Sequence, residues 1–115
     1  MIKMVINMAI PKVGKFSLHN GGGFVCRIMF NYMDDSGHSN TTGQSGDILL
    51  GQTKVVDPAE LGVPNGSIVT LKAFVVWGTN NTAQQSFVYE KGNPAIAKYT
   101  ITGTTLDNTL GLISN

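Results

Sequence analysis

Hydrophobic and polar residues alternate along most of this chain, as they do in β-strands that bury one face. The longest alternating runs cover residues 24–33 and 68–77. Their apolar faces comprise Phe24, Cys26, Ile28, Phe30, Tyr32, Val69, Leu71, Ala73, Val75 and Trp77. No segment shows the 3.6-residue period of an amphipathic helix. The pattern therefore predicts an all-β protein.

Eight runs of this kind are separated by turn signals rich in Gly, Asn, Asp and Pro. They cover residues 2–10, 13–18, 24–33, 38–42, 47–56, 68–77, 84–90 and 95–102. Gly51 is an expected bulge in the fifth run, and residues 57–66 are predicted to be a connector. A chain of 115 residues is near the commonest domain size, so we expect one antiparallel β-sandwich domain over residues 1–115.

The order of the runs also predicts where the loops gather. If successive strands are antiparallel, the connections that follow the even-numbered strands lie at the same end of the sandwich. Those connections are residues 19–23, 43–46, 78–83 and 103–106. All four consist mainly of small residues, so we expect a loop-rich end that is suited to binding.

Charge and composition narrow the possible partners. Eight basic and seven acidic residues give a net charge of +1 without any Lys/Arg run, so nucleic acid is not an expected partner. Asn7 interrupts the apolar N-terminal stretch, which therefore does not predict a signal peptide. No apolar run approaches the roughly 20 residues of a membrane-spanning helix. We expect no transmembrane segment, and the sequence leaves the compartment open between the cytoplasm and non-classical secretion.

Catalytic and metal-binding patterns are missing from the sequence. Residues 34–37 are typical of a turn, and the further oxygen ligands of a calcium loop do not follow them. His19 and His38 are well separated, and with the single cysteine, Cys26, they do not form a zinc pattern. No Gly-x-Ser-x-Gly motif and no defensible carboxylate pair occur. We expect no enzyme activity, metal or cofactor.

Several short stretches follow one another in an order that points to a family. They are residues 14–25 (GKFSLHNGGGFV), Asp34, residues 68–73 (IVTLKA), residues 88–91 (VYEK) and residues 100–106 (TITGTTL). Together they resemble the C-terminal, membrane-recognising domain of the cholesterol-dependent (thiol-activated) cytolysins. The resemblance implies a β-sandwich of about eight strands in two four-stranded sheets, with end loops that touch the bilayer.

The resemblance also implies roles for particular residues. Thr105 and Leu106 match the pair that recognises the sterol, residues 19–23 match a loop that inserts shallowly, and residues 43–46 fall near a third loop. The expected sterol- and membrane-binding residues are Thr105, Leu106, Asn20, Gly21 and Gly22. A threonine hydroxyl can hydrogen-bond the one polar group of a sterol, while a leucine can bury apolar surface.

The chain departs from the family pattern in one loop. The tryptophan-rich segment of the family corresponds to residues 74–85, where the second half keeps only Trp77 as an aromatic residue. Cys26 lies in a predicted strand and does not match the family's cysteine. The pore-forming domains have no counterpart here, so we expect a stand-alone module that does not form a pore on its own.

Other interpretations remain open at this stage. Trp77 can belong either to the core or to the loop end, and Thr105 and Leu106 can form a hydrophobic plug. An exposed Trp77 would suit a lectin, in which an indole stacks on a sugar. The expected glycan-binding residues are then Trp77, Thr79, Asn80 and Asn81. A structural or partner-binding sandwich is a third possibility, and its uncharged edge strands permit a homo-oligomer.

Overall fold

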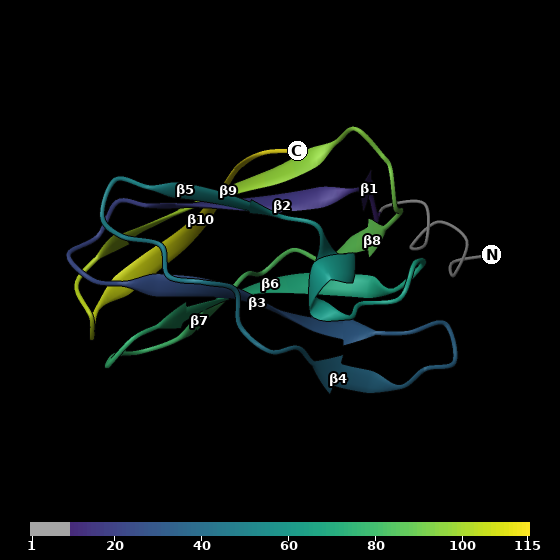
Figure 1. Ribbon diagram of the computed structural model, residues 1–115, viewed down its shortest axis with the longest axis horizontal. Helices are drawn as coiled ribbons and strands as arrows, with labels where there is room; N and C mark the ends of the chain where they lie inside the picture. Colours follow the sequence, from purple (N-terminus) through teal and green to yellow (C-terminus); the bar gives the residue numbers. More distant parts are fainter. Residues whose placement is uncertain (1–9) are drawn as a thin grey trace.

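The computed structural model describes residues 10–115, which form two β-sheets packed face to face (Figure 1). This arrangement confirms the predicted all-β sandwich class. Within the described residues there are ten strands rather than eight, in sheets of six and four. The strand predicted over residues 2–10 falls almost wholly on residues 1–9, outside the described part of the chain.

The larger sheet is built around the two longest alternating runs, which pair with each other antiparallel. Its strand order is β1 (Lys12–Val13), β8 (Phe87–Tyr89), β6 (Ile68–Val75), β3 (Cys26–Met33) and β4 (Ser39–Thr41), and β7 (Asn81–Thr82) also pairs with β6. Phe30 lies opposite Leu71 in the register of β3 and β6. Their alternation therefore places two apolar faces on the same side of the sheet.

The smaller sheet joins strands that are far apart in the sequence. Its order is β10 (Asn108–Ser114), β9 (Ile96–Gly103), β2 (Lys15–Asn20) and β5 (Thr53–Val56). Strands β2 and β9 are parallel, with Phe16 opposite Ala97, and β1 and β8 are also parallel. The expectation of uniformly antiparallel pairing is wrong for these two pairs, because sequence order does not determine which distant strands become neighbours.

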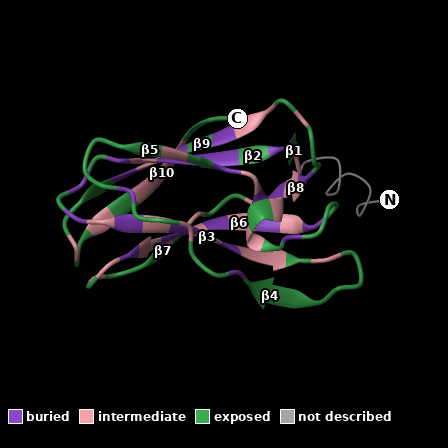
Figure 2. Cartoon of the chain, viewed as in Figure 1, coloured by how far each residue is buried: buried purple, intermediate pink, exposed green. Residues whose placement is uncertain are grey.

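The core lies between the two sheets, where the inward-facing residues of both are buried (Figure 2). The Phe16 ring lies 5.0 Å from that of Phe30 and 5.8 Å from that of Phe87, measured between centroids. Cys26 is also buried, and burial raises the pKa of its thiol to about 11. The thiol therefore stays protonated and acts as a small apolar side chain.

Residues 47–56 form two pieces instead of the single strand predicted. Ile48 makes an isolated bridge to Cys26 in the larger sheet, whereas β5 belongs to the smaller one. Gly51 has a φ of 85°, so it forms a turn between the sheets rather than a bulge within a strand.

Two further elements differ from the sequence prediction. Strand β10 follows the turn at residues 103–107, although the sequence predicted that the last strand ends at residue 102. The predicted connector contains a short 3₁₀ helix, η1 (Pro58–Leu61), which is capped by Asp57 and Glu60. No helix within residues 10–115 is long and apolar enough to cross a membrane.

Candidate functional site

Four loops gather at one end of the long axis, at the left of Figure 1. They comprise residues 20–25, 49–52, 76–80 and 103–107, and we call them the tip. The clustering agrees with the sequence prediction for three of the four loops. The loop before β5 contributes residues 49–52 instead of residues 43–46, because the chain crosses between the sheets at this end.

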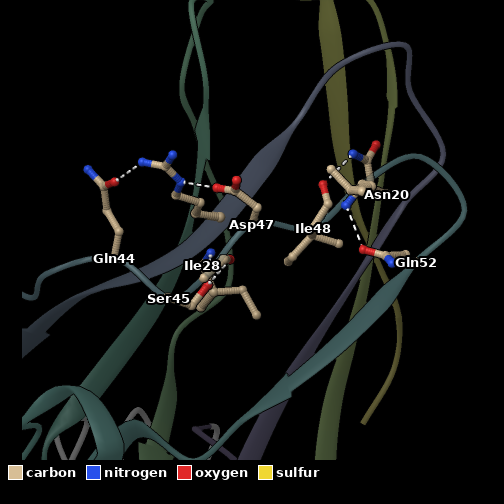
Figure 3. A network of polar contacts seen from close by, with 10 residues as sticks. Asn20, Ile28, Gln44, Ser45, Asp47, Ile48 and Gln52 are labelled. Atoms are coloured by element: carbon tan, nitrogen blue, oxygen red, sulfur yellow. Dashed lines mark hydrogen bonds and ion pairs between the residues drawn. The ribbon is translucent and has the colours of Figure 1, made fainter.

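Residues 43–46 run beside β3 and do not belong to the tip. The Ser45 N–H donates to the Ile28 carbonyl at 2.8 Å, as Figure 3 shows at close range. Arg27 holds the same segment by donating from Nε to Asp47 at 2.6 Å and from Nη1 to Gln44 at 2.9 Å. The prediction that residues 43–46 belong to the loop-rich end is therefore wrong.

Backbone hydrogen bonds join the tip loops to one another. The Gly51 N–H donates to the Asn20 carbonyl at 2.7 Å, and the Gly23 N–H donates to the Gly103 carbonyl at 3.2 Å. On the other side, the Thr79 N–H donates to the Thr105 carbonyl at 2.8 Å. A continuous set of bonds thus runs through all four loops.

Two glycines allow these loops to approach closely. A Cβ atom on Gly78 would lie 2.2 Å from the Thr105 carbonyl oxygen, and one on Gly22 would lie 2.3 Å from the Phe24 ring. Real side chains do not tolerate such distances from backbone or from a packed ring. These two glycines therefore allow the tip loops to pack closely.

Asn20 organises the loop between β2 and β3 from inside the protein. Its side chain has no exposed surface and donates to the carbonyl of Phe24 at 2.6 Å. It also donates to the carbonyl of Ile48 at 2.9 Å (Figure 3). Its Oδ1 accepts the Gly22 N–H at 2.9 Å. Asn20 and Gly22 are buried, so their expected role as membrane contacts is wrong, whereas Gly21 is exposed.

The tip presents large apolar side chains to solvent. Among such residues in the described part of the chain, the three most exposed are Trp77 at 94%, Leu106 at 74% and Leu50 at 65%. All three belong to the tip. Trp77 is therefore not in the core, and Leu106 is not a buried plug.

Leu50 and its neighbour Leu49, which is 48% exposed, were missed by the sequence analysis. The sequence Leu49-Leu50-Gly51 could have indicated that these leucines are exposed. Two consecutive leucines in a strand cannot both face the core, and the following glycine ends the strand in a turn.

Trp77 has an unusual backbone conformation. Its φ is 63°, and it is the only residue other than glycine with a positive φ within residues 10–115. It occupies the third position of the turn that is closed by the Gly78 N–H and the Val75 carbonyl at 3.1 Å. A left-handed conformation costs a non-glycine residue about 1–2 kcal/mol, so local backbone stability does not favour tryptophan here.

The polar residues near Trp77 hold the loops together. Asn80 Oδ1 accepts the Val75 N–H at 2.9 Å, and Asn81 Nδ2 donates to Asn108 Oδ1 at 2.8 Å. Thr79 is exposed, and Thr105 is partly exposed. Two of the four expected glycan-binding residues therefore have their amide groups engaged within the protein.

The tip is almost uncharged, since Asp107 is the only ionisable residue in its four loops. Within the described residues no cluster of His, Cys, Asp or Glu could hold a metal ion. The arrangement therefore offers apolar contact, one accessible aromatic ring and a partly exposed threonine.

Several solved toxin structures contain a similar fold, although sequence comparison finds no match. No family model and no curated protein matches the sequence. Listeriolysin O matches over 89% of this chain with 16% identity and a TM-score of 0.50. The human-specific toxin intermedilysin matches over 89% with 13% identity and a TM-score of 0.50. The membrane-binding domain of pneumolysin matches with 15% identity and a TM-score of 0.45, and 96% of that domain is covered.

The chain spans 22% of listeriolysin O and 23% of intermedilysin, so it corresponds to one part of each toxin. The identities are low, and the likeness therefore concerns the fold. The chain has the β-sandwich fold found in these cytolysins, as the resemblance in its sequence predicts.

Proposed function

We propose that this chain is a membrane-recognition module that binds sterol-containing bilayers through its tip and does not form a pore on its own. The observation that carries the proposal is the position of the most exposed apolar side chains. Trp77, Leu106 and Leu50 project from three different loops that hydrogen bonds hold together at one end. A surface of this kind is suited to contact with an apolar phase.

The energetics favour shallow insertion. Burying a leucine fully contributes about 1.5–3 kcal/mol, and tryptophan partitions readily to the membrane interface. The tip carries a single charged residue, Asp107, so little charge has to be desolvated. Binding should then depend weakly on salt, unlike attachment through a basic patch.

Thr105 and Leu106 are the proposed sterol contacts. The Thr105 hydroxyl makes no hydrogen bond to another described residue, while the Thr105 carbonyl is fixed by Thr79 at 2.8 Å. The Thr105 hydroxyl is thus available to pair with the sterol's polar group. Leu106 is the next residue in the sequence. A contact of this size is weak in one copy, and several copies on one vesicle would strengthen it.

Co-sedimentation with phosphatidylcholine vesicles, made with and without cholesterol, tests the proposal. We expect wild-type protein to sediment with the cholesterol-containing vesicles and Leu106→Ala to lose at least fivefold in affinity. Ile113→Ala is the matched control, because Ile113 is 62% exposed on β10 and lies outside the tip. Thr105→Ala should reduce the preference for cholesterol.

Two results would contradict this account. One is the absence of sedimentation with either vesicle at high protein concentration. The other is an equal loss of affinity in Leu106→Ala and Ile113→Ala, which would mean that any exposed apolar residue contributes and that the tip is not the site.

Glycan binding at the same end is a second candidate. The observation in its favour is the open face of Trp77, with exposed Thr79 and Asn80 nearby in the sequence. Tryptophan is a common stacking platform for sugars. A glycan array probed with wild type and Trp77→Ala should show hits that disappear in the variant, and hits that persist would exclude Trp77 as the platform.

A further inference from the structure

A hollow lies on the flank of the sandwich, between β10 and the segment that joins β7 to β8. It has a volume of about 230 Å³. Its lining consists of Ala83, Gln84, Gln85, Tyr99, Leu110, Gly111 and Leu112. None of these residues belongs to the tip, so the hollow is a separate feature of the fold.

Tyr99 lines this hollow and carries an unpaired polar group. Its side chain is only 2% exposed, and within the described residues its hydroxyl is a buried polar atom without a hydrogen-bond partner. Tyr89, the other fully buried tyrosine, donates its hydroxyl to Asp57. Buried hydroxyl groups in folded proteins nearly always have a partner, so the Tyr99 hydroxyl calls for one from beyond the described residues.

The cavity exists because the two sheets differ in extent on this side. Tyr99 on β9 faces the interior, and Leu110 and Leu112 on β10 pack against the core while remaining partly exposed. Strand β7, which lies next to β10 at this edge of the larger sheet, has only two residues, so the larger sheet does not cover this edge fully. The walls combine three aliphatic side chains, those of Ala83, Leu110 and Leu112, with two glutamines that lie at the more exposed part of the lining.

We propose that this cavity binds a small, mainly apolar molecule with one hydrogen-bonding group, such as a phenol or a short alcohol, whose polar group pairs with the Tyr99 hydroxyl. An apolar cavity of about 150 Å³ is known to hold benzene, so this volume suits a ring with one or two substituents. Burial raises the pKa of Tyr99 to about 12. The hydroxyl is therefore protonated at neutral pH and can both donate and accept.

An NMR titration with two probes of equal size tests the proposal. p-Cresol carries a hydroxyl where p-xylene carries a methyl group, so the pair isolates the hydrogen bond. We expect p-cresol to shift the amide signals of Ala83, Leu110 and Leu112, with a dissociation constant of about 1 mM or below for a ligand of this size. p-Xylene should bind the same place at least fivefold more weakly.

Matched variants test whether the Tyr99 hydroxyl causes the preference for p-cresol over p-xylene. Tyr99→Phe removes only the unpaired hydroxyl, so it should fold normally and bind both probes with equal, weak affinity. Tyr32→Phe is the control, because Tyr32 lies on β3 outside this cavity, and it should bind as wild type does.

Three outcomes would overturn the proposal. The first is the absence of localised shifts up to about 10 mM p-cresol, which would mean that water alone satisfies the hydroxyl. The second is equal affinity of wild type for both probes. The third is an unchanged preference for p-cresol in Tyr99→Phe.

Discussion

At the tip, the sequence predicts the exposure of some residues correctly and that of others incorrectly. Leu106 follows a predicted strand and a Gly-Thr-Thr turn, and its exposure agrees with the predicted loop. Asn20 stands beside three glycines and was expected at the surface. Asn20 is buried because its side chain bonds to the carbonyls of Phe24 and Ile48. Ile48 comes 28 residues later in the sequence, so no local sequence pattern predicts this burial.

Trp77 should be replaceable without loss of stability. In Trp77→Asn the indole is removed from a site where it is 94% exposed, and asparagine tolerates the left-handed conformation better. We expect the variant to be more stable by about 0.5–1 kcal/mol in urea unfolding, while it loses membrane affinity. A stability loss above about 1 kcal/mol would show that the indole packs against the protein.

Asn20 should be essential to the stability of the tip. Asn20→Ala leaves the Phe24 and Ile48 carbonyls and the Gly22 N–H without their partner, so we expect a cost of about 2–4 kcal/mol in chemical unfolding. Asn40→Ala is the control at an exposed site on β4 and should change stability by less than about 0.5 kcal/mol. Similar effects of the two substitutions would contradict the structural role of Asn20.

Asp57 should make the fold sensitive to acid. Burial alone would raise the pKa of its carboxyl, but the hydrogen bonds from Tyr89 and Ala59, together with Lys91 and Lys15, lower the pKa overall. A lowered folded-state pKa contributes stability above the usual carboxyl pKa of about 4, and this contribution is lost as the pH falls through the folded value.

Thermal unfolding between about pH 6 and pH 2.5 measures the contribution of Asp57. We expect the melting temperature of the wild type to fall more steeply below about pH 4 than that of Asp57→Asn. Parallel curves would mean that the Asp57 carboxyl has the same pKa in the folded and unfolded states.

At the scale of elements, strand length decided what the sequence could predict. Strands β3, β6 and β9 each have eight residues with clear alternation, and all three were predicted close to their observed bounds. Strand β10 was missed because Asn108, Gly111 and Ser114 resemble loop residues and because its leucines are only partly buried at the sheet edge. The run at residues 47–56 looked continuous because alternation does not reveal a change of sheet.

The buried and edge strands should respond differently to the same substitution. Leu71 on β6 has no exposed surface, so Leu71→Ala should cost about 2–5 kcal/mol. Leu112 on β10 is only partly buried, and Leu112→Ala should cost about half as much or less. Equal costs in chemical unfolding would show that β10 is packed as tightly as the centre of the larger sheet.

At the scale of the molecule, the fold separates a polar body from an apolar end. The protein measures 45 × 25 × 25 Å, and the tip closes one end of its long axis (Figure 1). Of the six residues that form Lys or Arg ion pairs with carboxylates in the described part, none belongs to the tip. In the proposed membrane-bound state, the tip would contact the bilayer while the charged surface would remain in water.

The measurement that tests this account most directly uses Trp77, the only tryptophan in the chain. Its emission should start at the long wavelength of a water-exposed indole and shift to shorter wavelength with vesicles that contain cholesterol. Lipids brominated near the headgroup should quench it, as expected for shallow insertion of the tip. Emission that stays unshifted and unquenched while the protein sediments with the vesicles would contradict the account, because another surface would then hold the membrane.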